Sequence, residues 1–166
     1  MPTPTYLPVQ SITLPGSASS VTFSSIPALS GDLVLTWRLA ATTAENGGKI
    51  TFNGDGGNNY SKLGAGAFGN LPGSDNYSSL AYISPHYYAD IGSDWDSSTI
   101  FQIFDYASSN KYKTCLGRSS QASTERGGYM NISFWSSLSP ISSITITASA
   151  NAWQAGSTFS LSRIEA

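Results

Sequence analysis

The chain has 166 residues and a net charge of −2, and charged residues make up only 11% of it, which is too little charge for long-range attraction to nucleic acid. An aromatic content of 12% separates it from disordered chains, and its length favours one domain with a sizeable core. Its single cysteine excludes an intrachain disulfide, and no stretch approaches the ~20 apolar residues of a membrane helix.

The first ten residues include Pro2, Pro4 and Pro8. Because proline cannot donate a backbone hydrogen bond to a sheet, we predict an extended N-terminal arm over residues 1–10, at most an edge strand. This arm either frays or docks on a neighbouring subunit, and Tyr6 is its candidate contact residue. We expect no signal peptide, since the basic and apolar regions of one are missing. A single domain is predicted over residues 11–166.

Apolar side chains alternate with polar ones along most of the remaining chain. This period of two is that of β-strands, whose successive side chains point to opposite faces of a sheet. Frequent glycine, proline and aspartate predict a loop-rich region over residues 61–98. No helical period exceeds two turns, so we predict an all-β sandwich or jelly roll. The predicted strands cover residues 11–14, 20–23, 32–39, 49–52, 80–83, 98–106, 111–118 and 127–135, with two more between 141 and 164.

Within these strands the alternation also assigns faces. The apolar sets that share a face are Leu33, Leu35, Trp37 and Leu39, then Met130, Ile132 and Phe134, then Ile144 with Ile146, and Phe159 with Leu161. The last four are expected to close the sandwich from inside. Cys115 lies within a strand pattern and is predicted to be a small buried apolar residue.

Residues 53–60 read NGDGGNNY, a dense turn signal. Asparagine, aspartate and glycine tolerate positive φ and hydrogen-bond to nearby backbone. Closely spaced side-chain oxygens also suit Ca²⁺, but the segment has only one carboxylate. We therefore interpret Asn53, Asp55, Asn58 and Tyr60 as a structural turn and expect no metal or other cofactor.

Residues 87–96 combine aromatic and acidic side chains, which is typical of surfaces that bind sugars. The candidate contact or recognition residues are Tyr87, Tyr88, Asp94, Trp95 and Asp96. The alternative is a solvated loop whose aromatics pack beneath it or against a neighbouring subunit. His86 is the only histidine, so neither a zinc cluster nor a Ser–His–Asp arrangement can be argued, and we expect no enzyme.

Four segments, in this order, resemble a family of virion structural proteins from tailed bacteriophages. They are VTFSSIPALSGDLVLTWRL (21–39), ITFNGDGGNNYSKL (50–63), FQIFDYASSNKYKT (101–114) and SSITITASANAWQAGSTFSLSRI (142–164). Together they cover over half of the chain, and AGSTFSL is the most specific piece. Residues 64–98 have no counterpart in the family, and SRI stands where the family usually has a Tyr-Gly-Ile type tail.

The resemblance implies a jelly-roll β-sandwich of two antiparallel sheets and a place in the virion after assembly in the host cytoplasm. The expected function is that of a small capsid decoration or cement protein. Its expected partners are its own copies, in a homotrimer, and the major capsid protein or another virion protein. The alternative is a receptor- or glycan-binding module of a tail or fibre, with a host surface glycan as its ligand.

Overall fold

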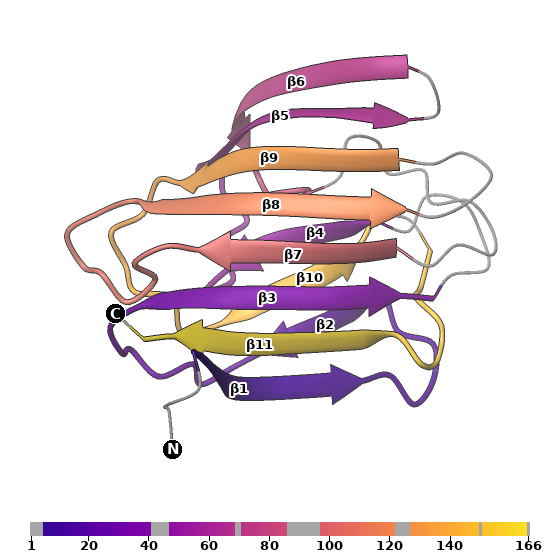
Figure 1. Cartoon of the computed structure of the whole chain (residues 1–166). Helices are drawn as coiled ribbons and strands as arrows, with labels where there is room; N and C mark the ends of the chain where they lie inside the picture. The colour runs from indigo at the N-terminus through magenta and orange to yellow at the C-terminus, as the bar shows by residue number, and fades with distance from the viewer. Residues whose placement is uncertain are drawn as a thin grey trace.

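The protein is built from β-strands in two sheets (Figure 1). The computed structural model describes residues 5–40, 47–68, 71–85, 97–121, 127–149 and 151–165, and these ranges contain strands and no helix. The strands are β1 (Tyr6–Thr13), β2 (Ser20–Phe23), β3 (Asp32–Leu39), β4 (Gly48–Phe52), β5 (Tyr60–Phe68), β6 (Leu71–Leu80), β7 (Ser97–Ile103), β8 (Lys113–Gln121), β9 (Gly127–Trp135), β10 (Ile144–Ala148) and β11 (Thr158–Ile164).

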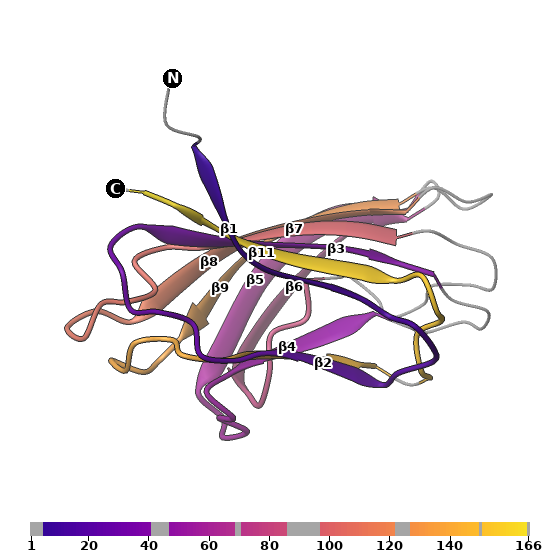
Figure 2. The ribbon, with the colours of Figure 1, turned by 90° about the horizontal axis from the view of Figure 1, so that it is seen from below.

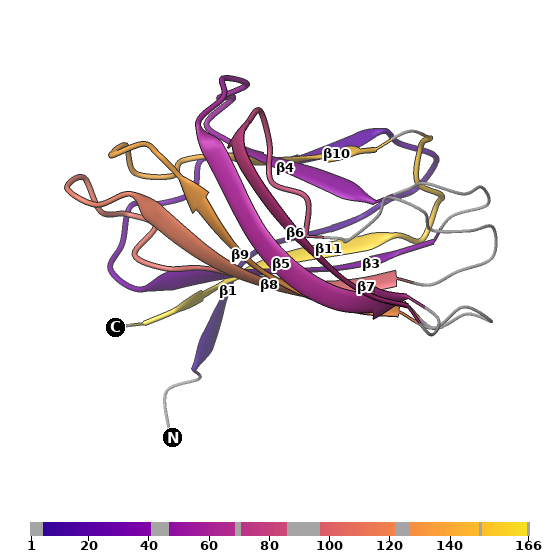
Figure 3. The ribbon, with the colours of Figure 1, turned by 90° about the horizontal axis from the view of Figure 1, so that it is seen from above.

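The two sheets are antiparallel and unequal in size. The larger has eight strands in the order β1-β11-β3-β7-β8-β9-β5-β6, and the smaller has the order β2-β10-β4. The small sheet lies behind part of the large one, and the two form separate layers when seen from below or above (Figures 2 and 3). The prediction of an all-β protein with two antiparallel sheets is confirmed.

The hydrophobic core fills the space between the two layers. The predicted inward residues Ile144, Ile146, Phe159 and Leu161 are buried, as are the apolar residues of β3. Trp153 packs against Phe159 with ring centroids 5.0 Å apart. Cys115 is buried too, and burial raises the pKa of its thiol above the ordinary range. These segments follow the simple rule that the apolar side of an alternating strand faces the core.

The N-terminal segment continues the large sheet. Residues 6–10 belong to β1, which pairs with β11 and forms one edge of the sheet. The register shifts between Pro8 and Gln10, so the strand is irregular next to the proline. Tyr6 lies opposite Ile164 and is exposed. Residues 1–4 lie outside the part of the chain that the structure describes.

The loop-rich interpretation of residues 61–98 is wrong for its first half. Residues 60–68 and 71–80 form β5 and β6, which pair with each other at the other edge of the large sheet (Figure 1). The strand predicted at 80–83 is reduced to a single bridge between Ile83 and Ile50. Glycines misled the prediction, because Gly64 leaves room within β5 for a neighbouring side chain and Gly66 lies against the backbone of β9. A Cβ atom at Gly64 would overlap the hydroxyl of Tyr129 on β9.

Candidate functional site

The outer side of the large sheet carries apolar side chains where a solvated sheet would carry polar ones. In β9, Asn131 and Ser133 face inward and are 2% and 0% exposed. The alternate residues Met130, Ile132 and Phe134 face outward and are 58%, 45% and 41% exposed. The usual polarity of a half-buried strand is therefore reversed over residues 130–134 of β9.

The pairing of the strands continues this apolar surface from β9 onto both of its neighbours, β8 and β5. Ile132 lies opposite Leu116 of β8 on one side and opposite Leu63 of β5 on the other. We call the six exposed side chains the outer apolar face: Leu63, Ile100, Leu116, Met130, Ile132 and Phe134. Their exposed area is on the order of 500 Å², within the range of the largest patch on a typical monomer, which is often functional.

Two shallow, open depressions lie on the outer apolar face. A shallow depression of about 360 Å³ lies between Leu63, Leu116, Met130 and Ile132. A second, of about 540 Å³, lies beside Arg118 and is lined by Ile100, Met130 and several small residues. Such depressions can receive side chains of a protein partner.

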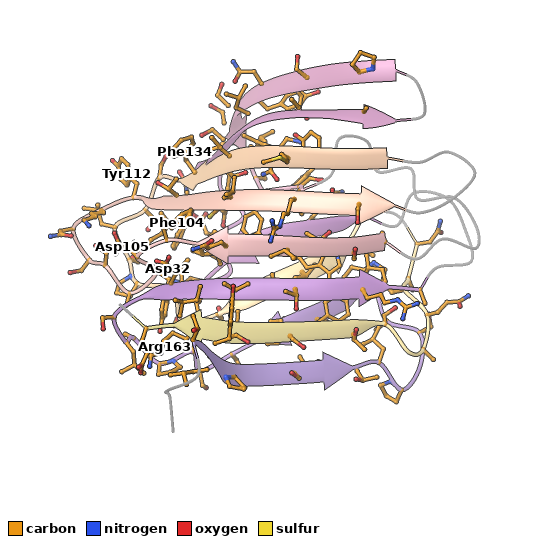
Figure 4. All side chains as sticks on the ribbon, viewed as in Figure 1. Asp32, Phe104, Asp105, Tyr112, Phe134 and Arg163 are labelled. Carbon is orange, nitrogen blue, oxygen red and sulfur yellow. The ribbon has the colours of Figure 1, made fainter. Side chains whose placement is uncertain are left out.

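Aromatic and acidic side chains gather at one end of this surface, around Phe134, Tyr112 and Phe104 (Figure 4). The carboxylates there already have partners within the chain. Asp32 accepts hydrogen bonds from Gln102 Nε2 at 2.9 Å and from the backbone nitrogen of Asp105 at 3.0 Å. The Asp105 carboxylate pairs with Lys111 at 2.8 Å. The carboxylates of Asp32 and Asp105 therefore hold the loop after β7 in place.

A polar cluster lies on the inner side of β5, β6 and β9. Lys62 and Asp75 form an ion pair of 2.8 Å, and their side chains are only 5% and 6% exposed. The Tyr129 hydroxyl donates to Asp75 Oδ1 at 2.6 Å. The Lys62 ammonium also lies 5.2 Å from the ring centroid of Tyr129 and 5.5 Å from that of Tyr77. These contacts compensate charged groups that burial alone would disfavour.

The turn between β4 and β5 is held by its own side chains and by distant strands. Asn53 has a φ of +53°, and its Oδ1 accepts from the backbone nitrogens of Ser142 and Ser143 at 2.8 and 3.1 Å. The Tyr60 hydroxyl donates to the Asp55 carbonyl at 3.0 Å. Burial raises the pKa of Tyr60 to about 12. Asn58 is exposed in the same turn.

The Asp55 carboxylate is the centre of this turn. It accepts from Trp135 Nε1 at 2.7 Å, from the Gly57 backbone at 2.9 Å and from Asn59. The bond from Trp135, followed by those from Asn59 and Gly57, holds the pKa of Asp55 below its usual value of 3.8 against the opposing effect of burial. Its oxygens thus serve hydrogen bonds that join the turn to β9.

The lowered pKa of Asp55 predicts a dependence of stability on pH. The unfolded chain binds this proton at higher pH than the folded one, so the stabilisation is complete well above pH 3.8 and is lost as pH falls through the folded pKa. We expect Asp55→Asn to cost about 1 kcal/mol at pH 7 and to remove part of the acid sensitivity. Urea unfolding at pH 7 and pH 3 measures both effects. Asp105→Asn, at an exposed ion pair, is the control, and equal acid sensitivity in the two variants would contradict the prediction.

Several sequence-based candidates cannot be placed. Tyr87, Tyr88, Asp94, Trp95 and Asp96 lie outside the described residues, as does His86. Within the described ranges, no three His, Cys, Asp or Glu side chains are grouped so that they could hold a metal ion. The same ranges contain no helix long and apolar enough to cross a membrane.

Sequence reasoning grouped Met130, Ile132 and Phe134 on one face but gave no sign that this face is the outer one. The available signal was the other face of the same strand, which carries Tyr129 and Trp135. Both of these are buried, and Trp135 stacks on Tyr60 with centroids 6.3 Å apart. Two large aromatics on the more polar side of a strand indicate that this side can be the buried one.

Comparison with known protein families finds no match for this chain, and comparisons with curated protein sequences and with solved structures find none either.

Proposed function

We propose that this protein is a non-enzymatic structural component of a tailed-bacteriophage virion, most simply a small capsid decoration or cement protein. It forms a homotrimer and binds the major capsid protein or another virion protein. The ordered sequence resemblance over residues 21–39, 50–63, 101–114 and 142–164 supports the virion location.

The observation that carries a role in protein–protein contact is the outer apolar face. An apolar patch on this scale is often functional, and a virion protein that acts by adhesion needs such a surface. Repetition of the contact at symmetry-related positions of a particle would multiply a weak interaction. The low charge of the chain favours the same role, because it limits repulsion between closely packed copies.

The fold proposed for this role is a jelly roll with an enlarged sheet. β1 and β2 lie in different sheets, and they pair with β11 and β10 respectively. Strands from the two chain ends that pair in this way across two sheets are what a wound jelly roll requires. The division into eight and three strands departs from two equal sheets, and the β5–β6 hairpin adds two of the eight strands to the larger one.

The test is the location of the protein in purified particles. Mass spectrometry of density-purified virions from the source phage, followed by cryo-electron microscopy, should find the chain in many copies on the capsid shell. Its absence from particles would overturn the virion role. Density confined to the tail tip would overturn decoration and support the receptor- or glycan-binding alternative.

A further inference from the structure

We propose that the outer apolar face is the surface through which copies of this chain bind one another. This assignment rests on the proposed function and deepens it, since it names the residues that hold the homotrimer together. The occupant of the face is therefore a second copy.

The reversed polarity of the strands is the first argument. Lys62, Asn131 and Ser133 point inward, while Leu63 and Ile132 on the same strands point outward. A sheet that stayed in water would gain by the opposite arrangement, because each exposed apolar side chain forgoes part of the free energy that its burial would supply. The strands are therefore suited to a state in which their outer side is covered.

The charge of this surface is the second argument. Register places the side chains of alternate residues of β5, β7, β8 and β9 on the outer side, and only Arg118 among them is charged. The others around the six apolar residues are mainly serine, threonine, alanine and glutamine. A strongly charged partner would lose hydration here without finding opposite charges. A second copy is nearly neutral, with a net charge of −2, and it is always present at equal concentration.

The size of the face is the third argument. A stable specific interface buries ~800 Å² on each partner. The six side chains supply on the order of 500 Å² of apolar area, and the serine, threonine and glutamine side chains around them supply a polar rim. The depression between Leu63, Leu116 and Met130, with a volume of about 360 Å³, can receive a side chain of the neighbouring copy.

The experiment measures the mass of the full chain in solution by light scattering over a range of concentrations. Ile132→Asp places a charge at the centre of the face and should raise the dissociation constant at least tenfold. Leu29→Asp is the matched control, because Leu29 is a similarly exposed apolar residue outside the face (47% against 45% for Ile132). A variant with Leu63, Leu116 and Ile132 all changed to threonine keeps strand propensity, so it tests the face even if Ile132→Asp fails to fold.

Each outcome decides a different claim. A trimer that both face variants dissociate, and that Leu29→Asp leaves intact, supports the assignment. A dimer that dissociates in the same way supports the surface but overturns the homotrimer of the proposed function. An oligomer that survives both face variants overturns the surface and leaves the homotrimer standing. A wild-type chain that stays monomeric at high micromolar concentration overturns both the surface and the homotrimer of the proposed function.

Discussion

Replacing Gly64 by alanine should destabilise the protein by about 3 kcal/mol, at the upper end of what overpacking costs. The added methyl group would overlap the hydroxyl and ring of Tyr129, which lies directly over Gly64 on the inner side of the sheet. Tyr129 cannot turn away cheaply, because it is buried and donates a hydrogen bond of 2.6 Å to Asp75. Either that bond or the pairing of β5 with β9 must give way.

The control for this variant is Gly128→Ala. Gly128 also lies in the large sheet, but a Cβ atom there would have no neighbour within 4 Å. Its replacement should change the unfolding free energy by less than about 0.5 kcal/mol, as measured by urea denaturation. In a Tyr129→Ser background, most of the cost of Gly64→Ala should disappear, since the two residues are in contact. Equal stability of Gly64→Ala and Gly128→Ala would show that the Tyr129 ring adapts freely.

The same glycine explains why part of the fold escaped prediction. In β3, β10 and the first part of β11 a buried apolar residue recurs at every second position, and sequence alone places these residues correctly in strands and in the core. In β5 and β6, the segments YSKLGAGAF and LPGSDNYSSL contain glycine and proline, which usually signal turns. Only the position of Tyr129, over 60 residues away in sequence, gives Gly64 its role. No local pattern contains that information.

The candidate surface escaped prediction for a related reason. Alternation divides the side chains of a strand between two faces, but it does not say which face meets the core. For β9, that choice depends on neighbours from distant segments: Tyr60 stacks on Trp135, and Asp75 binds Tyr129. The turn at residues 53–60 was recognisable from its composition. Its long-range bonds from Trp135, Ser142 and Ser143 were not, because they join residues about 80 to 90 positions apart.

The second large loss of stability is expected at the buried ion pair of Lys62 and Asp75, beneath the outer apolar face. We expect Asp75→Asn to cost about 3 kcal/mol, because it leaves the buried Lys62 ammonium without the carboxylate that lies 2.8 Å from it. Asparagine has nearly the shape of aspartate, and its carbonyl oxygen can still accept the bond from Tyr129. The loss therefore reports on charge rather than on packing.

The chain contains a matched control for this change in Asp105→Asn. The ion pair of Asp105 with Lys111 has the same length of 2.8 Å, but its side chains are 55% and 62% exposed. Water screens that pair, so its loss should cost far less than the loss of the Lys62–Asp75 pair. The free energy of unfolding of both variants is measured with urea at pH 7. Equal losses would contradict the prediction, because burial would then not increase the contribution of the Lys62–Asp75 pair to stability.

A double variant, Lys62→Met with Asp75→Asn, separates attraction from the cost of burying charge. If the single changes are costly because each leaves one charge buried, removing both charges should recover much of the loss. The double variant should then be more stable than Asp75→Asn alone. If the two losses simply add, the pair contributes through packing around Tyr77 and Tyr129 instead. In the first case the ion pair also fixes which side of β5 faces inward, because only that side can satisfy Lys62, and it thereby keeps Leu63 on the outer apolar face.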